Sequence, residues 1–194
     1  MLKNKSTSSS KTILAFVGMP GAGKSEATKY LLDKGFKSLR FGDFTEEAIK
    51  KEGFEITTEN EKIFREKIRK EMGMGAYGIL IKPKIDALIK KNDLIVLDGL
   101  YSWEEFIYLR KYFPFLKLVL IYAEPPIRHE RLALRKIRPI STNDSSTRDI
   151  REIEKLNKGG PIAIADFCIT NNEDNFPSFY KKIDEILERL DIKI

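Results

Sequence analysis

A glycine-rich segment near the start of the chain fills every fixed position of the pattern G-x-x-x-x-G-K-[ST]. Its residues are Gly18, Met19, Pro20, Gly21, Ala22, Gly23, Lys24 and Ser25. Glycines permit backbone conformations and close approaches that a side chain would block, so that successive N–H groups turn inward and form a nest for phosphate oxygens. In this pattern the lysine reaches the β- and γ-phosphates and the serine hydroxyl ligates Mg²⁺. We therefore predict that residues 18–25, the phosphate loop, bind a nucleotide.

The residues around the phosphate loop favour a strand before it and a helix after it. Residues 12–17 form the apolar run TILAFV, and a helical pattern over 24–32 ends at Gly35. A helix that begins at the loop adds its free amides and the positive end of its dipole to the phosphate site. The alternative is a glycine-rich turn that only joins a strand to a helix. The complete motif between the expected flanking elements favours the phosphate site.

Short apolar runs alternate with longer helical patterns along the rest of the chain, which is typical of an α/β fold with a largely parallel sheet. The expected strands are 12–17, 37–41, 94–97, 116–122 and 165–170. The expected helices are 24–32, two or three charged helices within 45–91, 102–112, a basic helix after 126, 149–156, and one from about Pro177. Residues 138–146 are expected to form a loop. Without a repeat or a linker, we expect one domain over 12–194 after a polar tail, 1–11.

Size and composition bound the class of protein. A chain of 194 residues is long enough for one domain with a hydrophobic core and too short for two. No apolar run approaches the roughly 20 residues that a membrane span needs, and the serine-rich start lacks the apolar region of a secretory signal. The single cysteine, Cys168, cannot form an internal disulfide. We therefore expect a cytoplasmic protein.

Basic residues gather in one part of the chain. The net charge is +6, and residues 128–151 hold seven Lys or Arg against three acidic residues, which is +4 of that total. Such a stretch either binds nucleic acid or clamps the phosphates of a small ligand. The bias toward arginine favours phosphate recognition, although composition alone leaves both partners open.

Asp98 follows the apolar strand 94–97 and precedes Gly99. A carboxylate at the end of a strand beside a phosphate loop holds Mg²⁺ through water in many nucleotide-binding proteins. The alternative is an ordinary Asp-Gly turn. We favour the magnesium role because a complete phosphate loop lies earlier in the same chain.

From Thr12 onward the chain resembles the P-loop nucleotide kinases, the group that contains adenylate kinase and dephospho-CoA kinase. The segments that carry the resemblance, in order, are LLDKGF at 31–36, RFGDF at 40–44, PIRHERL at 126–132 and ADFCITNN at 165–172. The resemblance implies a three-layer P-loop NTPase sandwich, with a five-stranded parallel sheet and helices on both faces. The loop differs from the G-G-x-G-S-G-K-S form of dephospho-CoA kinases, which leaves the acceptor open.

The same resemblance assigns roles on the acceptor side and in the lid, at about 128–151. Asp43 is expected to orient the acceptor hydroxyl or accept its proton, and the alternative is that it caps a helix starting at Thr45. Arg135 and Arg138 are expected to neutralise charge on the transferring phosphoryl group. Further arginine candidates are Arg128, Arg131, Arg148 and Arg151. The lid lacks the cysteines of zinc-bearing lids, so that no structural metal is expected.

These observations predict an ATP- and Mg²⁺-dependent kinase that phosphorylates a small nucleotide-like acceptor, with dephospho-CoA first and a nucleoside monophosphate second. Lys24, Asp43, Arg135 and Arg138 are the expected catalytic residues, and Ser25 and Asp98 the expected metal ligands. A membrane or nucleic-acid partner is not expected, and the oligomeric state stays open. The competing hypothesis is a nucleotide-binding switch or slow ATPase that acts through a protein or RNA partner.

Overall fold

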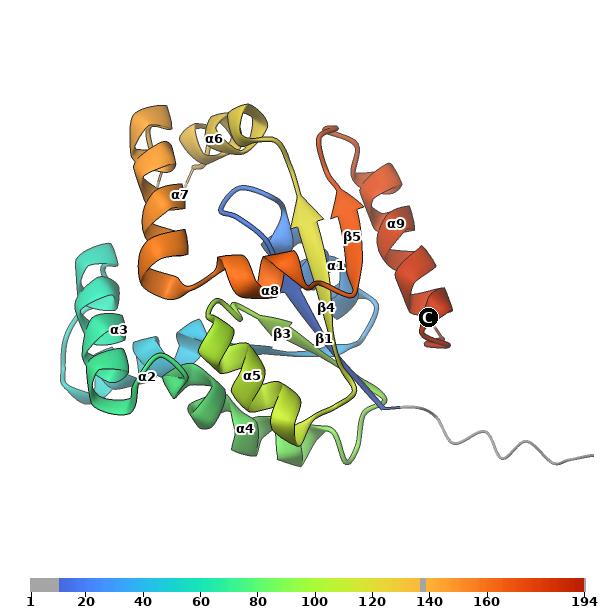
Figure 1. The fold of residues 1–194 in the computed structure, drawn as a ribbon, viewed down its shortest axis with the longest axis horizontal. Helices are drawn as coiled ribbons and strands as arrows, with labels where there is room; N and C mark the ends of the chain where they lie inside the picture. Colours follow the sequence, from blue (N-terminus) through green and yellow to red (C-terminus); the bar gives the residue numbers. More distant parts are fainter. Residues whose placement is uncertain (1–10, 137–138, 194) are drawn as a thin grey trace, which may run out of the picture.

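The computed structural model describes residues 11–136 and 139–193, and within them the strands form one parallel sheet (Figure 1). The strands are β1 (Thr12–Val17), β2 (Lys37–Arg40), β3 (Leu94–Asp98), β4 (Leu116–Tyr122) and β5 (Phe167–Thr170). Their order across the sheet is β2-β3-β1-β4-β5, and every neighbouring pair is parallel. The predicted five-stranded parallel sheet is confirmed.

Helices cover both faces of the sheet. They are α1 (Lys24–Asp33), α2 (Gly42–Lys51), α3 (Thr58–Met72), α4 (Ala76–Leu88), α5 (Trp103–Tyr112), α6 (Pro125–Ala133), α7 (Thr142–Leu156), α8 (Gly159–Ala163) and α9 (Phe176–Arg189). Alternate residues of β1 face opposite sides, as the two-residue period of a strand requires. Ile13 and Ala15 pack toward α4 and α5, whereas Leu14 and Phe16 pack toward α1 and α9. This arrangement gives the three layers that were expected.

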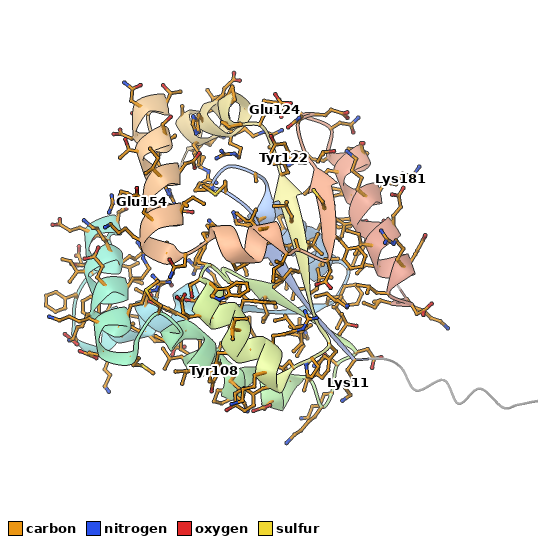
Figure 2. All side chains as sticks on the ribbon, in the orientation of Figure 1. Lys11, Tyr108, Tyr122, Glu124, Glu154 and Lys181 are labelled. Carbon is orange, nitrogen blue, oxygen red and sulfur yellow. The ribbon has the colours of Figure 1, made fainter. Side chains whose placement is uncertain are left out.

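Many side chains on the outer faces of the helices are polar. Glu154 on α7 and Lys181 on α9 are exposed and point into solvent (Figure 2). On α9 the residues that face the sheet, Phe179, Ile183 and Leu187, are buried and recur every four residues. This spacing is that of a helix with one apolar stripe.

The order of the strands fixes the position of the site. From β1 the chain continues to β2 and β3 on one side of the sheet, and β4 and β5 lie on the other side. The end of β1 is therefore the switch point of an open α/β sheet, where ligands bind beyond the carboxyl ends of the strands. The phosphate loop follows β1 at this point, and Asp98 ends β3 opposite Phe16 of β1.

Some element boundaries differ from those expected. The loop predicted over 138–146 is wrong for its second half, because α7 begins at Thr142. The hydroxyl of Ser141 accepts a hydrogen bond from the backbone N–H of Asp144 at 3.2 Å and so caps the helix. The start of α2 is also earlier than predicted, at Gly42, and the residues after Lys158 form the short helix α8.

Candidate active site

The phosphate loop joins β1 to α1 in a conformation that depends on glycine. Gly21 has φ +81°, and a Cβ there would lie 2.5 Å from the carbonyl oxygen of Arg128. Gly23 is the N-cap of α1 with φ +111°, and a Cβ there would collide with the amide nitrogen of Asn171. Because Gly23 has no side chain to cap the helix, the first-turn amides of α1 are available to an anion.

Lys24 lies in the first turn of α1 and turns back over the loop. Its Nζ donates hydrogen bonds to the carbonyl oxygens of Gly18 at 2.7 Å and Met19 at 3.0 Å. Burial, and then the positive charge of Lys158, lower the pKa of the Lys24 ammonium well below its usual value. An anion beside this ammonium would be bound strongly, because a buried charge gains more from a partner than an exposed one.

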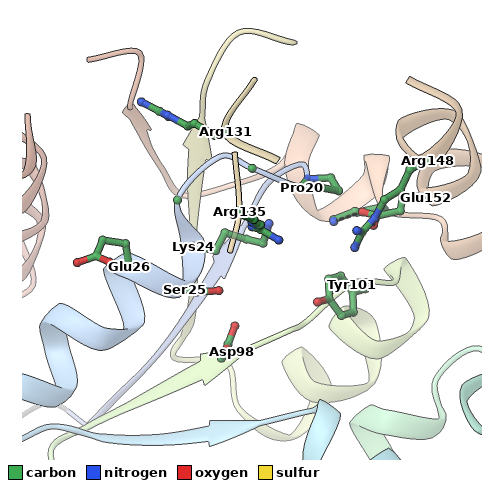
Figure 3. A pocket seen from close by; sticks show the side chains of 13 residues that line it. Pro20, Lys24, Ser25, Glu26, Asp98, Tyr101, Arg131, Arg135, Arg148 and Glu152 are labelled. Carbon is green, nitrogen blue, oxygen red and sulfur yellow. Dashed lines mark hydrogen bonds and ion pairs between the residues drawn. The ribbon is translucent and has the colours of Figure 1, made fainter. Parts of the chain in front are cut away.

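Ser25 and Asp98 line the same cavity as Lys24, and Figure 3 shows their side chains from α1 and the end of β3. Burial raises the pKa of Asp98, although the positive charges of Lys24 and Arg40 oppose the rise. Among the described residues there is no cluster of three His, Cys, Asp or Glu that could cage a metal by itself. A hydroxyl and one carboxylate beside a phosphate site suit Mg²⁺, which retains water and takes further oxygens from substrate phosphates.

The phosphate loop opens into a cavity of about 250 Å³ (Figure 3). Its lining residues are Pro20, Gly21, Gly23, Lys24, Ser25, Glu26, Asp98, Tyr101, Arg131, Arg135, Arg148, Glu152 and Lys158. Five of them are basic and three are acidic. The cations come from α1, α6, α7 and the residues next to them, so that they approach the loop from more than one direction. A cavity with this charge balance favours an anionic ligand with several oxygens.

The arginines of the predicted lid lie on or next to two helices, α6 and α7. Arg131 on α6 donates from Nη1 to the carbonyl oxygen of Asn171 at 2.7 Å. Arg135, just beyond α6, is exposed and makes up part of the cavity wall. Partial burial, and then the charge of Arg148, lower the pKa of the Arg135 guanidinium. Arg138 lies outside the described residues. Of the pair on α7, Arg148 lines the cavity, whereas Arg151 is exposed and is not part of the cavity wall.

The sequence of the whole chain places it among known proteins. Residues 14–157 match the model of a family described as AAA domain. A UPF0200 protein of Pyrococcus abyssi is 35% identical over 182 residues, which is 92% of this chain and 96% of that protein. The chain belongs to the AAA domain family and to the UPF0200 proteins. Another UPF0200 protein, from Methanocaldococcus jannaschii, is 33% identical over 180 residues, which is 92% of this chain and 90% of the relative.

Solved structures show that this UPF0200 chain has the fold of P-loop kinases. A shikimate kinase from Bacteroides thetaiotaomicron has a TM-score of 0.61 at 13% identity and covers 93% of this chain and 99% of its own. A gluconokinase from Sinorhizobium meliloti has a TM-score of 0.54 at 15% identity, with 93% of each chain covered. The predicted resemblance to P-loop kinases is confirmed at the level of the fold. Among the described residues, no helix has the length and apolar character needed to span a membrane.

The structure separates two readings of Asp43. The reading in which Asp43 caps a helix from Thr45 is wrong, because α2 begins at Gly42 and Asp43 lies within its first turn. Its carboxylate accepts a hydrogen bond from Nη1 of Arg40 at 3.3 Å. Asp43 is half exposed and does not line the 250 Å³ cavity. Its negative charge contributes to the raised pKa of Asp98, which does line the cavity. Its catalytic role stays a prediction.

Sequence reasoning missed three residues that line the cavity beside Arg148: Tyr101, Glu152 and Lys158. Glu152 is buried and pairs with Lys158 and, at 3.0 Å, with Nε of Arg148. Burial raises the pKa of the Tyr101 hydroxyl to about 12. The one available signal was the position of Lys158 beside Gly159, Gly160 and Pro161, where a helix was expected to end. Its burial could not be read from that pattern.

Proposed function

We propose that this chain is a Mg²⁺- and ATP-dependent phosphotransferase for a small nucleotide-like acceptor. The observation that carries the proposal is the shared cavity. Lys24, Ser25 and Asp98 lie on the sheet side of this cavity, and Arg135 and Arg148 line it from the opposite side. Arg131 also borders the cavity, but its guanidinium donates to Asn171 and Asp174. A phosphoryl transfer requires mainly positioning and charge stabilisation from the protein, and these residue types supply both.

Four groups of the cavity, and Asp43 outside it, have defined parts in the proposed transfer. The bond between the γ-phosphorus and the β,γ-bridging oxygen breaks, its electron pair stays on ADP, and a bond forms from the acceptor oxygen to the γ-phosphorus. Lys24 and Arg135 neutralise charge on the phosphate oxygens. Ser25 and Asp98 would hold Mg²⁺, which supplies further neutralisation of the phosphates when bound. Where the acceptor is a hydroxyl, as in dephospho-CoA, Asp43 is proposed to orient that hydroxyl or to accept its proton. A nucleoside monophosphate would attack through a phosphate oxygen, which has no such proton to lose.

The acceptor is the finer part of the proposal. Dephospho-CoA and nucleoside monophosphates are our first and second choices, as the segments at 31–36 and 40–44 suggest. The kinases of similar fold are named for shikimate and gluconate, which are hydroxyl acceptors without a nucleotide. Both compounds therefore belong in the test as representatives of a different acceptor class.

The test is ADP production from Mg-ATP in the presence of each acceptor, with the products identified by mass. The panel holds dephospho-CoA, ribo- and deoxyribonucleoside monophosphates, shikimate and gluconate. One acceptor that raises turnover well above background and gains one phosphate would establish the kinase and name its substrate. The Lys24→Ala variant, folded by circular dichroism, should then lose at least about 100-fold in rate. Tight ATP binding without stimulation by any acceptor would instead support a switch or slow ATPase.

A further inference from the structure

Lys158 is a buried cation in the cavity for which the proposed function gives no role. Its residue is 1% exposed, yet it forms part of the cavity wall with the phosphate loop. Its Nζ pairs with the carboxylate of Glu152 and lies 4.7 Å from the centre of the Tyr101 ring. A buried ammonium is costly unless it has a partner, so that the fold must hold this side chain in a defined place.

The backbone at Lys158 is anchored on α5. Asn157 ends α7 in a left-handed conformation, φ 49°, and its side-chain amide donates to Oε1 of Glu104 at 2.7 Å. Gly160 lies so close to Trp103 that a Cβ would be 2.5 Å from the indole ring. These contacts fix the α7–α8 junction to the layer that covers the sheet. Lys158 therefore reaches the cavity from a backbone that these contacts hold in place. A group that binds a ligand in a preorganised site needs such support.

Three cations meet around this side of the cavity. Burial lowers the pKa of Lys158, and its charge lowers the pKa of Lys24 more than any other charged neighbour does. Arg148 shares the carboxylate of Glu152 with Lys158. Burial alone would raise the pKa of Glu152, but Lys158 and then Arg148 outweigh burial and lower it. The single carboxylate of Glu152 thus pairs with two cations, Lys158 and Arg148. Lys24 contacts the carbonyls of the phosphate loop. An anion bound between Lys24 and Lys158 would therefore be stabilised by both charges.

We propose that Lys158 binds the γ-phosphate of the nucleotide from the α7–α8 side of the cavity, with Glu152 as its positioning residue. This inference rests on the proposed function. The γ-phosphate is the group concerned because the lysine of a phosphate loop reaches the β- and γ-phosphates, and Lys158 lines the same cavity as Lys24. Lys158 neither gives nor takes a proton in the transfer. Its positive charge lies close to the phosphoryl oxygens, which carry negative charge during the transfer.

A second buried pair shows what a purely structural arrangement looks like in this fold. Arg69 on α3 pairs with the fully buried Glu105 at 3.1 Å. Glu105 also accepts hydrogen bonds from the backbone N–H groups of Tyr101 and Ser102, and so caps α5. Neither Arg69 nor Glu105 lines the cavity. Lys158 differs from Arg69 because it lines the cavity. Its partner Glu152 also lines the cavity, whereas Glu105 holds the backbone at the start of α5.

The test compares the binding of Mg-AMP-PNP, which carries a γ-phosphate, with that of Mg-ADP by titration calorimetry on the full chain. The variant is Lys158→Met, which leaves Glu152 paired with Arg148. The control is Lys155→Met, which removes the same charge from an exposed position of α7. Lys158→Met should weaken AMP-PNP binding by at least about tenfold and leave ADP binding nearly unchanged. Lys155→Met should change neither, and Lys158→Arg should recover part of the preference.

The binding data separate failure of this inference from failure of the proposed function. Equal losses for both nucleotides in Lys158→Met, or no loss, would overturn the inference while leaving the proposed function in place. Wild-type protein that binds neither nucleotide would overturn the proposed function, and the inference with it. Urea unfolding confirms that the variants are folded. If Lys158→Met is unfolded, Lys158→Gln, which keeps a polar group beside Glu152, takes its place with the same expected loss.

Discussion

The guanidinium of Arg128 on α6 and the carboxylate of Asp149 on α7 form a two-pronged ion pair, with N···O distances of 3.1 and 2.8 Å. Arg128 is 4% exposed, and it also donates from Nη1 to the carbonyl oxygen of Pro20 and from Nε to that of Ala123, both at 3.0 Å. One side chain therefore joins both helices of the lid to the phosphate loop. Sequence reasoning offered Arg128 as a phosphate contact, but it is outside the cavity wall and supports the loop from behind.

Asp149→Asn should lower the free energy of unfolding by about 3 kcal/mol, because it leaves the buried charge of Arg128 without a counter-charge. The matched control is Asp174→Asn. Asp174 pairs with Arg131 at 3.1 Å but is 94% exposed, so that its loss should cost less than about 1 kcal/mol. Urea unfolding of the three proteins measures the difference. Equal destabilisation by the two substitutions would show that the Arg128–Asp149 pair does not hold the lid.

The stability of the fold should decrease in acid because of two carboxylates on α7. Burial alone would raise the pKa of Asp149 and of Glu152, but basic partners outweigh it: Arg128 and His129 lower the first, and Lys158 and Arg148 lower the second. A carboxylate whose pKa is lowered in the folded protein stabilises the fold fully when the pH is above its unfolded-state pKa. That pKa is 3.8 for Asp149 and 4.5 for Glu152. That stabilisation is lost as the pH falls through the lower folded value.

We therefore expect the urea midpoint of the wild type to fall steeply below about pH 4.5, with a flatter dependence in Glu152→Gln. The measurement is urea unfolding between pH 7 and pH 3. Glu152→Gln starts from a lower stability at pH 7, because Lys158 is buried without its charged partner. The same acid slope in both proteins would mean that Glu152 titrates alike in the folded and unfolded chain.

The parts of the site that lie in one short segment could be predicted from the sequence. The phosphate loop follows a local pattern of glycines with a lysine and a serine, and Asp98 follows a short apolar run that is typical of a buried strand. The closeness of the phosphate loop and Asp98 then follows, because both come after neighbouring parallel strands, β1 and β3. By contrast, the polar run from Thr142 to Ser146 favours a loop by composition alone. Its helical state depends on the cap at Ser141 and on the contact of α7 with Arg128.

Lys158 and Glu152 could not be predicted, for a different reason. A glutamate on a charged helix, and a lysine just beyond the end of that helix, usually point to solvent. Their burial arises only when α8 packs on Trp103 and brings the α7–α8 junction over Tyr101. These contacts join segments about 50 residues apart, and no local pattern encodes them. The sequence therefore predicts the sheet side of the cavity better than its lid side.

Gly21→Ala should damage both the fold and nucleotide binding. Gly21 and Gly35 both have positive φ, +81° and +92°, so that alanine is strained at either position by about 1–2 kcal/mol. Only at Gly21 does the added Cβ also meet a backbone atom, the carbonyl oxygen of Arg128. Gly35→Ala should therefore lose stability and keep its affinity for Mg-ATP, whereas Gly21→Ala should lose both. Calorimetric titration and urea unfolding separate the two effects, and normal affinity in Gly21→Ala would contradict this account of the loop.

Asp98→Asn should raise stability while lowering activity. Burial raises the pKa of Asp98, which means that its charged form is destabilised in the fold at neutral pH. The neutral amide removes this cost, so that the free energy of unfolding should increase. It also removes the carboxylate that is proposed to hold Mg²⁺ through water, and magnesium-dependent turnover should fall by about 100-fold. A variant that keeps full activity would show that Asp98 serves only the turn at Gly99.

Arg135→Glu should slow the chemical step, and Lys136→Glu is its control. Both residues follow α6 and are exposed, and both substitutions change the charge equally, but only Arg135 lines the cavity. A lid arginine that stabilises the transferring phosphoryl group contributes about 100-fold or more to the rate, so that kcat should fall by that factor in Arg135→Glu. Lys136→Glu should change kcat less than about twofold, because a surface charge beyond the cavity is screened by solvent and salt. Rates at saturating Mg-ATP and acceptor give the comparison, and equal kcat values in the two variants would place Arg135 on the solvated face of the lid.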